Sequence, residues 1–464
     1  MRIRLVLTIS CLAAGLAWQA SAKDAEPAAH ALLKDIASQV RPAEMQGTIQ
    51  KLVGFGTRHT LSDTKSSAHG IGAARQWVKS RFAEFSQKCG GCLEVTMPTQ
   101  IVTGERLTGP TAIADVLAIQ RGTTDPQRVI VISGHIDSRV TDVMNSTSDA
   151  PGADDDGSGT AAVIEAARVL SQHKFPATLV YAVLSGEEQG LYGGKLLAQY
   201  AQQHNWKVEA DLNNDIIGGT TSANGVKESG YVRVFSEGTR SIETPEEAVR
   251  RRYNGGEVDS PSRNLARFAN GLASQYLDGF AARMIYRTDR YSRGGDQVPM
   301  LAAGYPAIRF TEAIENYDHE HQDVRTENGV HYGDTPDGID FPYLANVTRL
   351  NAVTMAALAM APAPPPTVKI EGAVSLDTTV SWTPAAGAKG YRVWWRDTTG
   401  PVWTNSRLAP ADATSLVLKN VNIDDWFFGV ASVSADGYES PVEFPGPAGS
   451  FAKPGEPAAQ SSSR

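Results

Sequence analysis

Four segments of the sequence carry acidic and histidine side chains where strands are expected to end or a helix to begin. They are His135-Ile136-Asp137 after an apolar run, Asp154-Asp155-Asp156 before a helix, Glu187-Glu188 after a second apolar run, and Asn214-Asp215 near the end of a third. In open α/β sheets, ligands bind beyond the carboxyl ends of the strands. We therefore expect the four segments to meet in one crevice.

The three adjacent aspartates indicate a bound cation, because their charges repel each other and further acids would surround them. Histidine with carboxylates is a ligand set for zinc, and oxygen-rich sites also accept manganese or magnesium. Each motif alone is more often a solvated surface or a helix cap. Their order and their placement together favour a metal site.

Alternating elements are predicted around these motifs. Residues 128–133 and 178–184 are short apolar runs rich in β-branched side chains, which is typical of buried strands. Residues 159–170, between them, place apolar side chains on one face of a helix. This order predicts an α/β fold.

The composition changes at a Pro-rich linker, residues 362–366. Residues 367–450 then read as about seven short strands, which predicts a small all-β sandwich. Trp382 on the second strand and Tyr391 on the third resemble a fibronectin type III domain. We interpret the Trp-rich strands as core and edge packing, with contact to a surface or glycan as the alternative. Because every candidate ligand precedes the linker, we expect the sandwich to be dispensable for catalysis.

The first 22 residues have the pattern of a cleaved signal peptide, with cleavage after Ala22. This predicts a secreted or periplasmic protein, a mature first domain over 23–361 and no membrane span. In an oxidising compartment Cys89 and Cys92 are expected to bond to each other. A redox-active pair would need a helix N-terminus, whereas this pair follows a helical stretch. Residues 451–464 are polar and are expected to be disordered.

The charge balance bears on possible partners. The 464 residues include 43 basic and 51 acidic side chains, for a net charge of −8. Nucleic-acid binding needs a positive surface, so we exclude it as a general function.

The motifs, as they stand, resemble those of the secreted bacterial di-zinc aminopeptidase family, whose relatives include glutamate carboxypeptidase and glutaminyl cyclase. The resemblance covers roughly residues 54–359 and also includes Gly304-Tyr305-Pro306-Ala307 and the segment His319-Glu320-His321-Gln322-Asp323. It implies a mixed, mostly parallel sheet with helices on both faces, the zinc exopeptidase type.

The resemblance also implies two Zn²⁺ per chain and a role for each motif residue. One zinc is held by His135, Asp155 and Asp215, and the other by Asp155, Glu188 and His319, with His321 as the competitor of His319. The resemblance further implies that Glu187 is the general base and that Tyr291 stabilises the oxyanion. It implies that Asp137 orients His135 and that Asp296 is an acid with a structural role.

The implied activity is removal of N-terminal residues from peptides by a metal-bridged hydroxide, with Glu187 taking the proton. Two alternatives use the same fold. A glutaminyl-cyclase-like acyltransferase is expected to use one zinc and a different acid motif. A catalytically inactive receptor or adhesin should have lost ligands, yet none is missing.

Overall fold

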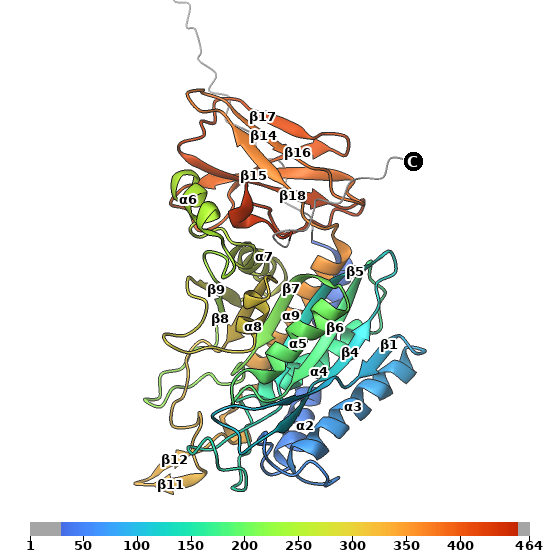
Figure 1. Cartoon of the computed structure of the whole chain (residues 1–464), viewed down its shortest axis with the longest axis vertical. Coiled ribbons are helices and arrows are strands. Elements are labelled where there is room, and N and C mark those ends of the chain that lie inside the picture. Colours follow the sequence, from blue (N-terminus) through green and yellow to red (C-terminus); the bar gives the residue numbers. More distant parts are fainter. Residues whose placement is uncertain (1–28, 453–464) are drawn as a thin grey trace, which may run out of the picture.

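The computed structural model describes residues 29–452, in which a layered α/β body carries a smaller all-β unit (Figure 1). The predicted signal peptide, 1–22, lies outside the described residues, as does most of the predicted tail, from 453 onward. Within the described range, no helix combines the length and the apolar character needed to span a membrane.

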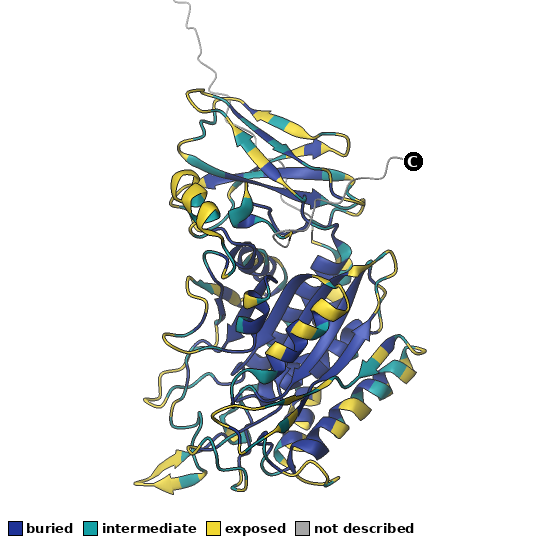
Figure 2. Ribbon diagram, in the orientation of Figure 1, coloured by how far each residue is buried: buried dark blue, intermediate teal, exposed yellow. Residues whose placement is uncertain are grey.

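An eight-stranded sheet forms the centre of the α/β body. Its strands, in spatial order, are β1 (Leu93–Thr96), β4 (Val116–Gln120), β6 (Ala177–Leu184), β5 (Asp125–His135), β7 (Lys207–Asn214), β10 (Ala307–Thr311), β8 (Tyr231–Phe235) and β9 (Ala281–Ile285). Neighbours β6, β5, β7 and β10 run parallel, as do β8 and β9, and the other pairs are antiparallel. The central strands are buried along nearly their whole length (Figure 2), as their apolar runs predicted.

Helices cover both faces of this sheet, which confirms the predicted fold class. One apolar core contains side chains of α1 (Ala31–Gln39), α2 (Pro42–Val53), α3 (Gly70–Lys88), α4 (Gly157–Leu170), α7 (Pro261–Tyr276) and α9 (Phe341–Met360). The other core contains α5 (Tyr192–Gln203) and α8 (Gln297–Ala302). Other described elements lie outside these layers. They are the exposed helix α6 (Pro245–Asn254), the hairpin of β11 (Arg325–Glu327) and β12 (Val330–Tyr332), and the antiparallel pair of β2 (Thr99–Val102) and β3 (Thr111–Ala114).

The order of the strands in the sheet reverses at β5, and this reversal marks the position of the crevice. From β5 the chain passes through α4 to β6 on one side, and then through α5 to β7 on the other side of β5. Ligands of open α/β sheets bind where the strand order reverses in this way. His135 is the last residue of β5 and Asn214 is the last residue of β7, so their motifs meet at this point.

The C-terminal unit consists of two three-stranded antiparallel sheets. One contains β13 (Val368–Glu371), β14 (Thr378–Trp382) and β17 (Ser415–Leu418), and the other β16 (Asn405–Pro410), β15 (Gly390–Asp397) and β18 (Trp426–Val433). Six strands are therefore described where about seven were expected. Trp382 and Tyr391 are buried in the core between the sheets, together with Trp395, which accounts for part of the Trp-rich pattern as packing. Helix α9 ends at Met360 and β13 begins at Val368, on either side of the predicted linker.

Buried charges join the sandwich to the α/β body. Arg396 on β15 contacts both carboxylate oxygens of Asp259, at 2.7 and 2.9 Å, and neither side chain is more than 1% exposed. Arg267 on α7 binds the same carboxylate at 2.9 Å and also donates to the main-chain oxygen of Pro401. The sandwich is therefore attached by contacts that water does not replace.

We expect Arg396→Met to destabilise the protein by about 3–5 kcal/mol, because removing one partner of a buried pair leaves the other charge poorly compensated. Lys419→Met is the matched control, since Lys419 pairs with Asp377 at the surface of the same unit. Urea unfolding of both variants measures the difference. Equal, small effects would show that the contact does not hold the two parts together. Deleting the sandwich would remove the same contact, so its predicted dispensability has to be tested on protein shown to be folded.

The structure joins Cys89 and Cys92 in the predicted disulfide. Cys89 directly follows α3 and Cys92 directly precedes β1, so the bond closes the turn between a helix and the edge strand. A structural role is consistent with this position after the end of a helix.

Candidate metal centre

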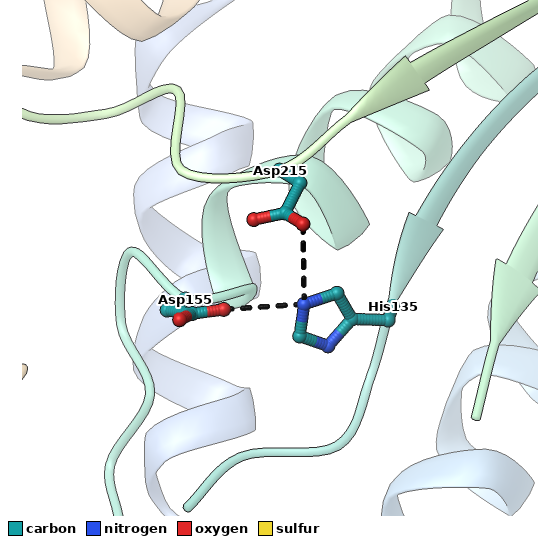
Figure 3. A group of neighbouring side chains, drawn as sticks. All are labelled: His135, Asp155 and Asp215. Carbon is teal, nitrogen blue, oxygen red and sulfur yellow. Dashed lines mark ion pairs between the residues drawn. The ribbon is translucent and has the colours of Figure 1, made fainter. Parts of the chain in front are cut away.

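The first group of possible ligands lies at the ends of β5 and β7. His135, Asp155 and Asp215 come from the end of β5, from the loop before α4 and from the residue after β7 (Figure 3). The Nε2 atom of His135 lies 3.1 Å from Asp155 Oδ1 and 3.8 Å from Asp215 Oδ2. All three residues are buried. The sequence predicted these three residues as one zinc ligand set.

The second group shares one carboxylate with the first. It contains Asp155, Glu188 and His321. The Nε2 atom of His321 lies 2.8 Å from Asp155 Oδ2 and 3.2 Å from Glu188 Oε1. Asp155 therefore presents one oxygen to each imidazole, as a carboxylate that bridges two ions would.

These residues fit metal ions by their chemistry and by their unpartnered atoms. In each group the candidate ligand atoms lie within 4.8 Å of one another. Two of these atoms, His135 Nε2 and Glu188 Oε1, are buried without a hydrogen-bond partner among the described residues. Buried polar atoms normally have partners, so each of these two atoms is explained by a ligand bound at its own group. Imidazole nitrogens and carboxylate oxygens are zinc ligands.

Asp137 holds the two loops of the centre together. Its carboxylate accepts hydrogen bonds from the main-chain N–H groups of Gly186 at 2.8 Å and Glu188 at 3.2 Å, and from the hydroxyl of Thr60 at 3.1 Å. The Nδ1 atom of His135 lies 3.1 Å from the main-chain oxygen of Asp137 and 3.6 Å from its carboxylate. The main-chain oxygen of Asp137 is thus the nearer partner of His135, and its carboxylate positions the loop of Glu187 and Glu188.

The flanking aspartates of the 154–156 run have structural partners. Asp156 caps α4 through the N–H of Gly159 at 2.7 Å and accepts the N–H of His135 at 2.8 Å. Asp154 accepts the N–H of Gly218 at 2.8 Å. Only the central aspartate is therefore free to face both histidines.

Glu187 belongs to neither group, although it lies among their acids. Burial raises the pKa of its carboxyl well above the ordinary value, and the neighbouring carboxylates of Glu188 and Asp215 raise it further, while His135 lowers it. Burial likewise raises the pKa of Asp156, with added repulsion from Asp215. This concentration of buried acids is the electrostatic setting that a cation would stabilise.

Two predicted site residues are placed elsewhere. His319 lies in neither group of candidate ligands, and its place is taken by His321, the competitor named from the sequence. Tyr291 is 80% exposed and its ring stacks against Arg287, so the structure gives it no place among the groups of the centre. Asp296 is buried and accepts the N–H of Gly194 at 3.0 Å, which fits a structural acid.

The prediction of His319 depended on its spacing to an acid. Asp323 follows His319 by four residues, the spacing expected from the family resemblance. The acid that reaches the centre is instead Asp334, whose carboxylate accepts the N–H groups of Asp154 at 2.8 Å and Asp155 at 2.7 Å. The hairpin β11–β12 lies between His321 and Asp334 and lengthens the spacing.

We expect His321→Ala to lose close to one equivalent of zinc and His319→Ala to keep all of it, because only His321 faces Asp155 and Glu188. Elemental analysis of the two purified variants checks this. His319 and His321 lie two residues apart on the same segment, so each variant controls for the other. Loss of zinc from His319→Ala alone would return the assignment to the first choice.

Sequence reasoning missed three buried arginine contacts. Arg58 is fully buried and donates to the main-chain oxygens of Ile136, Pro151 and Gly152, which fixes the two loops that carry His135 and Asp155. Arg309 on β10 lies 2.8 Å from Asp215 Oδ2. Arg139 lies 3.1 Å from Glu188 Oε2. No local pattern marks these residues, since each acts on a distant segment.

Proteins of similar sequence are described as zinc metalloproteases. Residues 115–336 match peptidase family M28. A protein of Leptosphaeria maculans described as a probable zinc metalloprotease is 41% identical over 425 residues, covering 91% of this chain and 98% of the relative. A protein of Pyricularia oryzae with the same description is 42% identical and covers 88% of this chain and 83% of its own. The chain thus falls among the zinc metalloproteases. It belongs to peptidase family M28.

Solved structures share the fold at lower identity. LapB from Legionella pneumophila superposes with a TM-score of 0.52 at 21% identity, over 72% of this chain and 76% of its own. The LapA aminopeptidase of the same organism superposes with a TM-score of 0.51 at 19% identity, over 77% of this chain and 80% of the LapA chain. The two sequence relatives named above are fungal, which corrects the expectation of a bacterial family.

Proposed function

We propose that the protein is an exported aminopeptidase that removes N-terminal residues from peptides and uses two zinc ions. The observation that carries the proposal is the carboxylate of Asp155, which directs Oδ1 to His135 and Oδ2 to His321. A shared carboxylate between two nitrogen-and-oxygen ligand sets is the arrangement of co-catalytic metal pairs. The aminopeptidase name of the LapA structure and the predicted signal peptide support the exopeptidase and export parts.

His135, Asp155 and Asp215 would hold one ion, and Asp155, Glu188 and His321 the other. Bound zinc would supply Lewis acidity, which makes water more acidic and polarises a peptide carbonyl. Glu187 takes the proton of the attacking water on its carboxylate and delivers it to the nitrogen of the leaving amine. Asp137 keeps Glu187 in place through the N–H groups on both sides of it.

Hydrolysis of a panel of amino-acyl arylamides, with N-acetylated copies as controls, tests this function. The free amines should be hydrolysed, the acetylated copies should not, and a chelator should stop the reaction until zinc is returned. Equal hydrolysis of acetylated substrates would contradict an aminopeptidase. Formation of pyroglutamate from a glutaminyl substrate without hydrolysis would favour the cyclase. Zinc binding without turnover of any substrate would favour an inactive receptor.

A further inference from the structure

The two histidines of the centre face opposite kinds of partner at Nδ1. For His135 the partner is the main-chain oxygen of Asp137, 3.1 Å away. A carbonyl oxygen can only accept, so Nδ1 of His135 carries the hydrogen. The lone pair of this ring is then on Nε2, the atom that faces Asp155 and Asp215, and His135 is ready to bind a metal ion.

For His321 the partner of Nδ1 is a donor. The Nη2 atom of Arg139 lies 2.7 Å from His321 Nδ1. A guanidinium has no acceptor, so Arg139 presents only N–H groups to this ring. The Nε2 atom of the same ring lies 2.8 Å from Asp155 Oδ2.

Arg139 also contacts a second member of the same group. Its Nε atom lies 3.1 Å from Glu188 Oε2, so one guanidinium occupies two of the three residues of the second group. The first group has a different arginine neighbour. Arg309 contacts only Asp215 there, is fully buried, and is also held by Asp289.

The two arginines differ in their freedom to move away. The side chain of Arg139 is 17% exposed, whereas that of Arg309 is 0% exposed. Arg139 can therefore turn toward solvent, and Arg309 cannot do so without opening the core.

We propose that Arg139 competes with the second metal ion for Glu188 and His321, so that the group of Asp155, Glu188 and His321 binds its ion last and releases it first. Filling this group requires Arg139 to withdraw from Glu188 and His321. Among the described residues, the group of His135 has no arginine contact on its histidine. This inference rests on the ligand set of the proposed function and adds a regulation of metal content.

Zinc titration of the full-length apoprotein against a chromophoric chelator tests the proposal without using peptide hydrolysis. The wild-type protein should bind two ions with dissociation constants that differ by at least about tenfold, a typical effect of a residue that contacts metal ligands. Arg139→Gln should lower the dissociation constant of the second ion by about tenfold. The dissociation constant of the first ion should stay within about twofold of the wild-type value.

Arg106→Gln is the matched control. Arg106 is exposed and donates to the main-chain oxygen of Glu188 at 3.1 Å, so it places a charge in the same neighbourhood without touching a ligand side chain. It should keep the wild-type difference between the two constants. An equal effect of both variants would overturn the proposal, because charge alone would then explain the result.

Three other outcomes would also overturn it. Weaker second binding in Arg139→Gln would show that Arg139 supports the ligands, and an unchanged constant would show that it has no effect on them. Binding of a single ion by every variant would remove the second site altogether. Failure of the proposed function looks different, since it would appear as two bound ions without hydrolysis of arylamides.

Discussion

Replacing Glu187 by glutamine should reduce turnover by about two to four orders of magnitude, the usual contribution of a positioned general base. Glutamine has nearly the same shape but cannot take up the proton of the attacking water. Since Glu187 lies in neither candidate ligand group, the variant should keep its fold and its zinc. The Michaelis constant should change little, because the lost interaction acts mainly in the transition state. Steady-state kinetics and elemental analysis of the same preparation measure both effects.

Glu188→Gln is the control for this prediction. The two glutamates are neighbours, yet only Glu188 faces His321 and Asp155. The Glu188 variant should lose metal affinity as well as rate, and added zinc should restore part of its activity. If Glu187→Gln lost zinc and Glu188→Gln kept it, the roles of base and ligand would be exchanged. Unchanged turnover in both variants would place the reaction elsewhere.

Asp155→Asn should remove at least one zinc and lower activity at least about a thousandfold, since a catalytic metal contributes several kcal/mol to the transition state. The two carboxylate oxygens of Asp155 face different histidines. An amide keeps a single oxygen, so it can serve only one of the two ligand groups. Metal content by elemental analysis and the rate on an arylamide substrate measure the two effects.

Asp154→Asn is the control for Asp155→Asn, because it makes the same change from carboxylate to amide at the neighbouring residue. Asp154 accepts the N–H of Gly218 with one oxygen, and asparagine retains that acceptor. Its other oxygen lies beside the carboxyl of Glu312, so the amide group can donate there. This variant should keep both zinc ions. Equal metal loss in Asp154→Asn would mean that charge in the loop, and not the bridge by Asp155, holds the ions.

The fold and most of the centre could be predicted because their signals are local. The apolar runs at 128–133 and 178–184 are buried on both faces of a sheet, so they contain almost no polar residue. Each strand ends where polar residues begin, and those residues face the crevice. These segments contain His135, Asp155, Glu188 and Asp215, which the structure brings together. Their division into two ligand groups was implied by the family resemblance.

The choice of His319 differs from the arrangement in the structure. It relied on the spacing to Asp323, whereas Asp334 is the acid that holds the loop of Asp155. Asn328-Gly329 lies between β11 and β12, and both residues have positive φ, at +52° and +80°. Asn-Gly between two short strands is the sequence signal for such a turn. This turn could therefore have been predicted from the sequence as a hairpin that separates His321 from Asp334.

The buried arginines could not be predicted by the same reasoning. Arg139 and Arg309 meet their carboxylates only after distant segments have packed, and Arg139 lies 182 positions from its partner His321. A lone arginine in a sequence is usually a solvent-exposed charge. Their position is a result of the tertiary fold, so it becomes visible only in the structure.

The contact between Asp334 and the loop of Asp155 also bears on when activity can arise during synthesis. The two segments are separated by 179 positions in the chain. A growing chain that has not yet reached Asp334 has no partner for the N–H groups of Asp154 and Asp155, so this loop is not yet fixed. The nascent protein should therefore be unable to cleave peptides until nearly all of the α/β body has left the ribosome.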